Sequence, residues 1–143
     1  MGKEYLRFTL GACAALVACV CCDLNRQPPG APYDSTVEPA QGRRGTQCTI
    51  GFWTDDGRPE ITYLAEVRWA RDSSGPFVAY DEISCEERTP TMGPTWGHYY
   101  EGWWTAVWPH SDSALPYIRI YPMATNGRDT ATGEPVQFIP TGG

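Results

Sequence analysis

Aromatic side chains crowd one short stretch of this sequence. The segment "GPTWGHYYEGWW" (Gly93–Trp104), followed by Trp108, supplies four tryptophans and two tyrosines. Both residue types join a large apolar surface to a polar group, so they stack on sugars and anchor protein partners. We interpret the stretch as partly core and partly an exposed recognition surface. The expected recognition residues are Trp96, Tyr99, Tyr100, Trp104 and Trp108.

Side chains alternate along a strand, so a strand over residues 97–108 would divide these aromatics between two faces. Trp103, Thr105 and Val107 share one face, and Tyr100, Trp104, Ala106 and Trp108 share the other. We predict that Trp103 points inward, because Val107 accompanies it, and that Trp104 points outward. The alternative is that the whole cluster is core.

A second candidate binding element is the loop Asn126-Gly127-Arg128-Asp129. Asn126 and Arg128 supply polar groups that a ligand could contact. The alternative is a plain hairpin turn, for which Asn-Gly is a preferred pair.

Catalytic and metal chemistry find little support. His98 and His110 lie near Glu101 and Asp112, but the sequence has no HExxH and no paired-cysteine spacing of the kind that binds zinc. It also lacks GxSxG, P-loop and GxGxxG motifs. We therefore expect no metal, no cofactor and no enzymatic activity.

Length and charge narrow the function classes further. The 143 residues suit one domain, and 17 acidic against 11 basic residues give a net charge of −6. Nonspecific nucleic-acid binding needs Lys and Arg to neutralise phosphates. We therefore expect no nucleic-acid partner.

The N-terminus has the parts of an export signal. Lys3 and Arg7 precede an apolar run of 13 residues, Phe8–Val20. That run matches the apolar region of a signal peptide and is shorter than the ~20 residues that span a bilayer. Retention as a membrane-spanning anchor is the less favoured alternative.

The end of this run, Leu16-Val17-Ala18-Cys19, resembles the lipobox of bacterial lipoproteins. The resemblance implies transfer of diacylglycerol to the Cys19 sulfur, cleavage after residue 18, and a lipid anchor that contains palmitate. Leu10–Cys13 fits the same pattern but leaves too short an apolar run. Ordinary cleavage, which would release a soluble exported protein, remains an alternative.

The domain organisation follows from these features. Residues 1–18 are the predicted lipoprotein signal peptide, and residues 19–46 are the lipidated cysteine and a tether rich in Pro and Gly. Residues 47–143 are the predicted folded domain. "ITYLAEVRWAR" (Ile61–Arg71) alternates with period two, and four further short segments read as strands: 47–53, 77–85, 116–124 and 135–140. The predicted fold class is therefore all-β, a small antiparallel β-sandwich.

The segment Leu115–Thr141 resembles the last two strands of fibronectin type III domains. Six residues occupy matching kinds of position: Tyr117, Arg119, Ala124, Asn126, Gly127 and Pro135. The resemblance implies an immunoglobulin-like or fibronectin-like sandwich, in which Trp53 would be an inward tryptophan. The two cysteines and the aromatic segment depart from that pattern.

Cys48 and Cys85 are the two cysteines of the predicted domain. Export to an oxidising compartment predicts a disulfide between them. Two buried thiols are the alternative.

Together these features predict an exported lipoprotein, anchored by lipid in the cell membrane or outer membrane with its domain outside the cytoplasm. We expect a non-enzymatic binding module whose partners are the membrane, through the lipid, and an envelope protein or glycan. A cell-wall polysaccharide-binding module is one alternative. A lipoprotein encoded by a phage or prophage and involved in superinfection exclusion is another.

Overall fold

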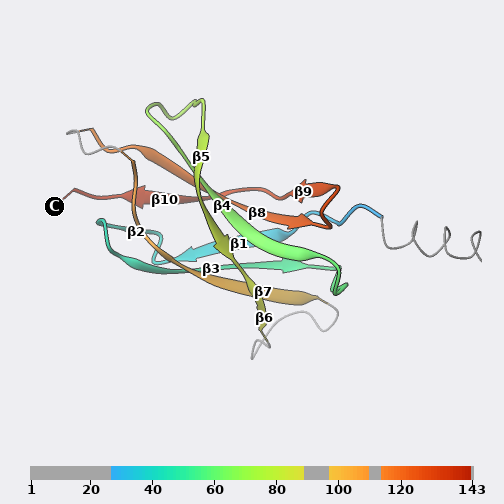
Figure 1. Ribbon diagram of the computed structural model, residues 1–143. Coiled ribbons are helices and arrows are strands. Elements are labelled where there is room, and N and C mark those ends of the chain that lie inside the picture. Colours follow the sequence, from blue (N-terminus) through green and yellow to red (C-terminus); the bar gives the residue numbers. More distant parts are fainter. Residues whose placement is uncertain (1–26, 89–96, 110–113, 143) are drawn as a thin grey trace, which may run out of the picture.

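A computed structural model describes residues 27–88, 97–109 and 114–142 (Figure 1). No helix long and apolar enough to cross a membrane occurs among these residues. The described residues form strands in the following order: β1 (Tyr33–Glu38), β2 (Gln41–Gly42), β3 (Gln47–Thr54), β4 (Thr62–Ala70), β5 (Val78–Ser84), β6 (Glu86–Arg88), β7 (His98–Thr105), β8 (Tyr117–Thr125), β9 (Thr130–Thr132) and β10 (Val136–Pro140).

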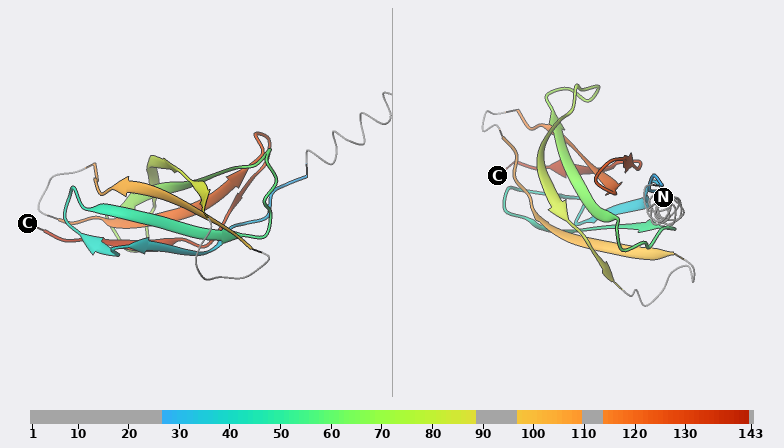
Figure 2. Two further views of the ribbon diagram at one scale, coloured as in Figure 1. Left: turned by 90° about the horizontal axis from the view of Figure 1, so that it is seen from below. Right: turned by 45° about the vertical axis from the view of Figure 1, so that its right-hand side comes forward.

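The strands make two sheets that pack face to face (Figures 1 and 2). The first sheet has the order β1-β3-β7-β6, and the second has the order β2-β10-β8-β4-β5, with β9 paired to β8. The paired strands are antiparallel except β2 and β10, which are parallel. The predicted all-β sandwich is therefore confirmed.

The alternation of residue types in the sequence correctly predicts which side chains of β4 are buried in the core. Tyr63, Ala65 and Val67 are buried between the sheets, while the intervening Leu64 and Glu66 are only half-buried. β4 and β8 pair along their full length, from Thr62 opposite Thr125 to Ala70 opposite Tyr117. This long ladder forms the centre of the second sheet.

Trp104 lies at the middle of the core. Its side chain is 1% exposed and meets the ring of Phe138 edge to face, with ring centroids 5.2 Å apart. The indole Nε1 donates a hydrogen bond to Asp81 Oδ2 at 3.1 Å. Trp104 belongs to the first sheet, whereas Phe138 and Asp81 belong to the second, so this residue joins the two sheets.

The alternation predicted for β7 is correct, but the predicted orientation is wrong. Tyr100, Trp104, Ala106 and Trp108 are buried, whereas Trp103 is 57% exposed and Val107 is 45% exposed. From Tyr100 to Trp108 this buried face carries only uncharged side chains and Gly102, while the Trp103 face includes Glu101 and Thr105. Burying the first face removes more apolar area from water, and this decides the orientation.

The predicted boundary between tether and domain at residue 47 is also wrong. Residues 33–38 and 41–42, expected to be tether, form β1 and β2. β1 pairs with β3 and buries Val37 opposite Ile50, while β2 pairs with β10. The sequence of β1 is mostly polar because an edge strand with one exposed face needs few core residues. The predicted signal peptide and Cys19 lie outside the described residues.

Replacing Trp104 should therefore damage the fold far more than replacing its neighbour. We expect Trp104→Ala to lower the free energy of unfolding by about 3–5 kcal/mol, because it leaves a large cavity in the core. Trp103→Ala, the matched control, should cost less than about 1 kcal/mol. Urea denaturation of both variants measures the difference, and equal losses would contradict the orientation of β7.

Candidate functional site

Most of the predicted recognition residues are part of the core. Tyr100, Trp104 and Trp108 are buried, so their assignment to a binding surface is wrong. Trp96 lies outside the described residues. Tyr99 is half-buried on the outer face of the first sheet and remains a candidate.

Tyr99 lies on that outer face in line with two other aromatic side chains, Trp53 and Trp103, and we call these three residues the aromatic strip. Trp53 on β3 lies directly opposite Tyr99 on β7, with ring centroids 5.1 Å apart. Trp103 lies four residues further along β7, or about 13 Å at the usual rise of a strand. The strip therefore follows the long axis of the sheet.

Gly51 explains how the Tyr99 ring fits within the aromatic strip. A methyl group at position 51 would collide with the Tyr99 hydroxyl, which shows that the ring lies across the glycine. Gly51 is paired with Glu101, so the Tyr99 side chain covers the space between Trp53 and Trp103. Any larger residue at position 51 would push Tyr99 off the sheet.

Polar groups border the aromatic strip. The Arg88 guanidinium lies over the Trp103 ring, 4.9 Å from its centroid, and Arg88 Nε is 3.9 Å from Glu101 Oε1. The Tyr99 hydroxyl donates to Glu101 Oε2 at 3.2 Å. Burial, followed by the Glu101 charge, raises the pKa of Tyr99, so its hydroxyl stays protonated at neutral pH. The strip thus combines apolar ring faces with a guanidinium, a carboxylate and a hydroxyl.

A second polar group of residues lies where β7 begins. His98 Nδ1 is 2.7 Å from Glu87 Oε2, and burial, together with the Glu87 charge, raises the pKa of Tyr100 to about 12. His98 and Glu101 occupy opposite faces of β7, so the possible zinc site that joined them is not formed. Within the described ranges, no group of three or more His, Cys, Asp or Glu residues is arranged to hold a metal ion. His110 and Asp112 lie outside those ranges.

The loop between β8 and β9 is a hairpin turn. Asn126 Oδ1 accepts hydrogen bonds from the backbone N–H groups of Arg128 and Asp129 at 2.9 and 2.8 Å. Gly127 has φ +93°, a conformation that favours glycine. The Asn126 amide also donates to the Gln27 carbonyl at 3.0 Å. These bonds occupy Asn126 with turn formation and leave Arg128 exposed at the tip.

The predicted disulfide between Cys48 and Cys85 is not formed: both are free, buried thiols. Cys48 pairs with Trp104 on β7, whereas a methyl group on Gly102 would lie 3.0 Å from Cys85 Sγ. The two sulfurs therefore face β7 positions two residues, or about 7 Å, apart. Burial raises the pKa of both thiols, that of Cys85 to about 12, so neither is a reactive thiolate at neutral pH.

Sequence reasoning missed Trp53, Trp103 and Arg88 as surface residues. The signal for Trp53 was present, because alternation in "QCTIGFW" (47–53) groups it with Gln47 and Thr49 and opposes it to Phe52. The resemblance that made Trp53 an inward tryptophan is wrong on this point, since Phe52 fills the core instead. The position of Arg88 beside the aromatic strip could not be predicted from the sequence, because it depends on the pairing of β6 with β7.

Comparison with known proteins finds no match: no family model, no curated protein and no solved structure matches this chain.

Proposed function

We propose that this chain is a lipid-anchored envelope lipoprotein whose β-sandwich is a non-enzymatic binding module. The leader, with Cys19 at the end of its apolar run, supports export and anchoring. The observation that supports binding is the aromatic strip, in which a tryptophan that is 57% exposed is aligned with two further aromatic rings. A buried tryptophan needs no ligand to explain it, but three aligned outer-face aromatics are unusual on a small soluble domain.

We also propose that the sandwich is immunoglobulin-like. The order β1-β3-β7-β6 corresponds to strands A, B, E and D of that fold, and β10-β8-β4-β5 corresponds to G, F, C and C′. Trp69, packed against the core from β4, occupies the strand where such domains carry a tryptophan. Folds of this kind commonly serve as binding modules, which agrees with the proposed function.

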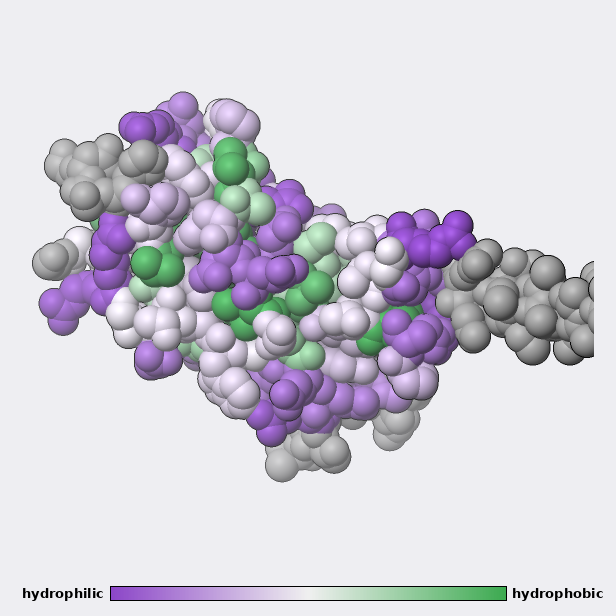
Figure 3. All heavy atoms as spheres, in the orientation of Figure 1, coloured by the Kyte–Doolittle hydropathy of each residue, from purple (hydrophilic) through white to green (hydrophobic). Residues whose placement is uncertain are grey.

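The ligand that best suits the aromatic strip is a glycan. Flat ring faces match the apolar faces of sugar rings, and the adjacent Arg88, Glu101 and Tyr99 groups can hydrogen-bond to hydroxyls. A stable protein interface usually needs a broad complementary surface. On the face drawn in Figure 3, hydrophobic residues gather in small separate groups instead. The strip is narrow and bordered by polar groups, which favours a sugar chain over a protein partner.

The corrected domain boundary shortens the proposed tether. Gln27 already contacts the domain, because its carbonyl accepts from Arg58 Nη2 at 3.2 Å. Gln27 is eight positions after Cys19, a reach of at most about 28 Å when extended. A lipid on Cys19 would therefore hold the domain close to the membrane surface.

Loss of the Trp103 ring should weaken glycan binding without unfolding the protein. We expect Trp103→Ala to reduce binding to envelope polysaccharide at least tenfold, because the exposed ring provides stacking area that alanine lacks. Binding is measured by isothermal titration calorimetry with the polysaccharide, because the fluorescence change of Trp103 itself is lost in this variant. Ile139→Ala is the matched control, since Ile139 is an exposed apolar residue of the other sheet. Binding that survives intact in Trp103→Ala would refute the glycan proposal.

Lipidation is tested separately. We expect Cys19→Ala to abolish metabolic labelling by a palmitate analogue and to release the protein from membranes. Cys13→Ala is the control, because residue 13 lies in the competing lipobox-like sequence. Undiminished labelling of the Cys19 variant would remove the basis for the proposed anchor.

A further inference from the structure

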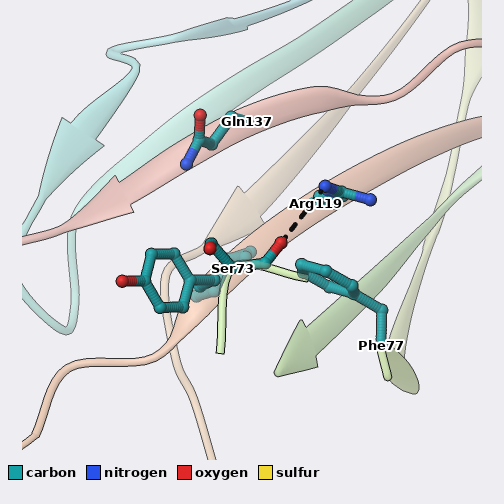
Figure 4. Close-up of a pocket in the computed structure, with 6 residues that line it drawn as sticks. Ser73, Phe77, Arg119 and Gln137 are labelled. Carbon is teal, nitrogen blue, oxygen red and sulfur yellow. Dashed lines mark hydrogen bonds between the residues drawn. The ribbon is translucent and has the colours of Figure 1, made fainter. Parts of the chain in front are cut away.

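The outer face of the second sheet contains a pocket that is separate from the aromatic strip. Its volume is about 190 Å³, and Figure 4 shows its polar and aromatic side chains; the lining residues are Ser73, Phe77, Tyr117, Ile118, Arg119 and Gln137. Sites for whole small molecules usually measure about 300–1,000 Å³. This pocket therefore suits a single residue or chemical group.

Arg119 is the charged residue of the pocket. Its guanidinium lies over the Phe77 ring, 4.1 Å from the centroid, and Nη2 donates a long hydrogen bond of 3.5 Å to the Ser73 carbonyl. Stacking uses the face of the guanidinium, so the remaining N–H groups still point outward in its plane. Within the described part of the chain, no carboxylate forms an ion pair with Arg119.

A second arginine increases the positive charge beside the pocket. Arg68 on β4 lies directly opposite Arg119 on β8, and like charges in that position repel. Glu66 compensates Arg68 through an ion pair of 2.6 Å, and the Tyr121 ring lies 3.9 Å from its guanidinium. Arg119 has an aromatic neighbour but no such anion. The carboxylate of a ligand would supply the missing negative charge, and it could accept two parallel hydrogen bonds from the Arg119 guanidinium.

The groups around Arg119 match a peptide rather than an isolated anion. Gln137 on β10 is paired with Arg119, and its side-chain amide offers one donor group and one acceptor, as a peptide bond does. The Ser73 carbonyl retains acceptor capacity for an N–H group. Phe77 and Tyr117 provide apolar walls for a side chain.

We propose that this pocket binds the C-terminal residue of a peptide or protein partner. The terminal carboxylate pairs with Arg119, the last peptide group bonds to Gln137 and the Ser73 carbonyl, and an apolar side chain lies against Phe77 and Tyr117. The pocket is on the opposite sheet from the aromatic strip, so it depends on neither the glycan nor the lipid.

The pocket is well placed for an external partner. Asn126, in the loop after β8, contacts Gln27, where the chain enters the described structure. Arg119 is six residues before Thr125, the last residue of β8, so the pocket lies about 20 Å along the strand from the loop that contacts Gln27. In Figure 1 the loop between β4 and β5, which supplies Ser73 and Phe77, projects from the body of the sandwich on the side away from residue 27.

The test is isothermal titration calorimetry on the full-length chain in detergent. The probes are an acetylated tripeptide ending in leucine with a free carboxylate, and the same peptide as its C-terminal amide. We expect a dissociation constant of about 1 mM or tighter for the carboxylate, and binding at least tenfold weaker for the amide. Arg119→Gln should remove this difference. Arg43→Gln, a change at an exposed arginine that does not line the pocket, should leave it unaltered.

Gln137→Glu provides a second variant that does not depend on removing the arginine. The new carboxylate, opposite Arg119, would form an ion pair with the guanidinium and so block it from a ligand. This variant should therefore fold as stably as the natural chain but lose peptide binding. Equal affinity for the two peptides, no saturable binding, or undiminished binding by Gln137→Glu would each overturn the proposal. Preference for methyl glucuronide over the peptide would also overturn it, in favour of an acidic sugar.

Discussion

The burial of Trp104 is the constraint on which the other features of this domain depend. Its indole is enclosed between the sheets, where an unpaired N–H would be costly, and Asp81 on the facing sheet accepts its hydrogen bond. Strand geometry then requires Trp103 to point away from the core. The same register places Tyr99 and Trp53 together on the outer face. The buried Trp104 therefore determines which aromatic side chains lie on the outer face, where a ligand could contact them.

The fold was largely predictable because its strands alternate clearly. β8 shows period two over all nine residues and β4 over its first seven, and the turn sequences 55–57 and 72–76 lie on either side of β4. The orientation of β7 was not predictable from alternation alone, because both of its faces carry large aromatic side chains. The apolar area that decides it depends on contacts between strands: Ile83 and Cys85, for example, approach β7 at Gly102 only after β5 and β7 come together. β1 was missed because an edge strand with one buried valine looks like a polar linker.

The two proposed sites differ in how far the sequence could indicate them. Trp53 and Trp103 belong to regular strands, so correct alternation on two neighbouring strands is enough to assemble the aromatic strip. The pocket around Arg119 also needs Ser73 and Phe77, which lie in the loop between β4 and β5. Loop residues approach a sheet face through tertiary contacts that have no sequence period. That Cys48 and Cys85 are free thiols could also not be predicted from the sequence, because it depends on which β7 residue each cysteine faces.

Hydrogen exchange of the tryptophan indole groups, followed by nuclear magnetic resonance, tests the central role of Trp104 most directly. Each indole N–H signal is assigned by replacing one tryptophan at a time with phenylalanine. The account predicts that the Trp104 Nε1–H exchanges at least about a hundredfold more slowly than that of Trp103, because it is buried and bonded to Asp81. Equal exchange rates, or a protected Trp103 with an exposed Trp104, would contradict the account.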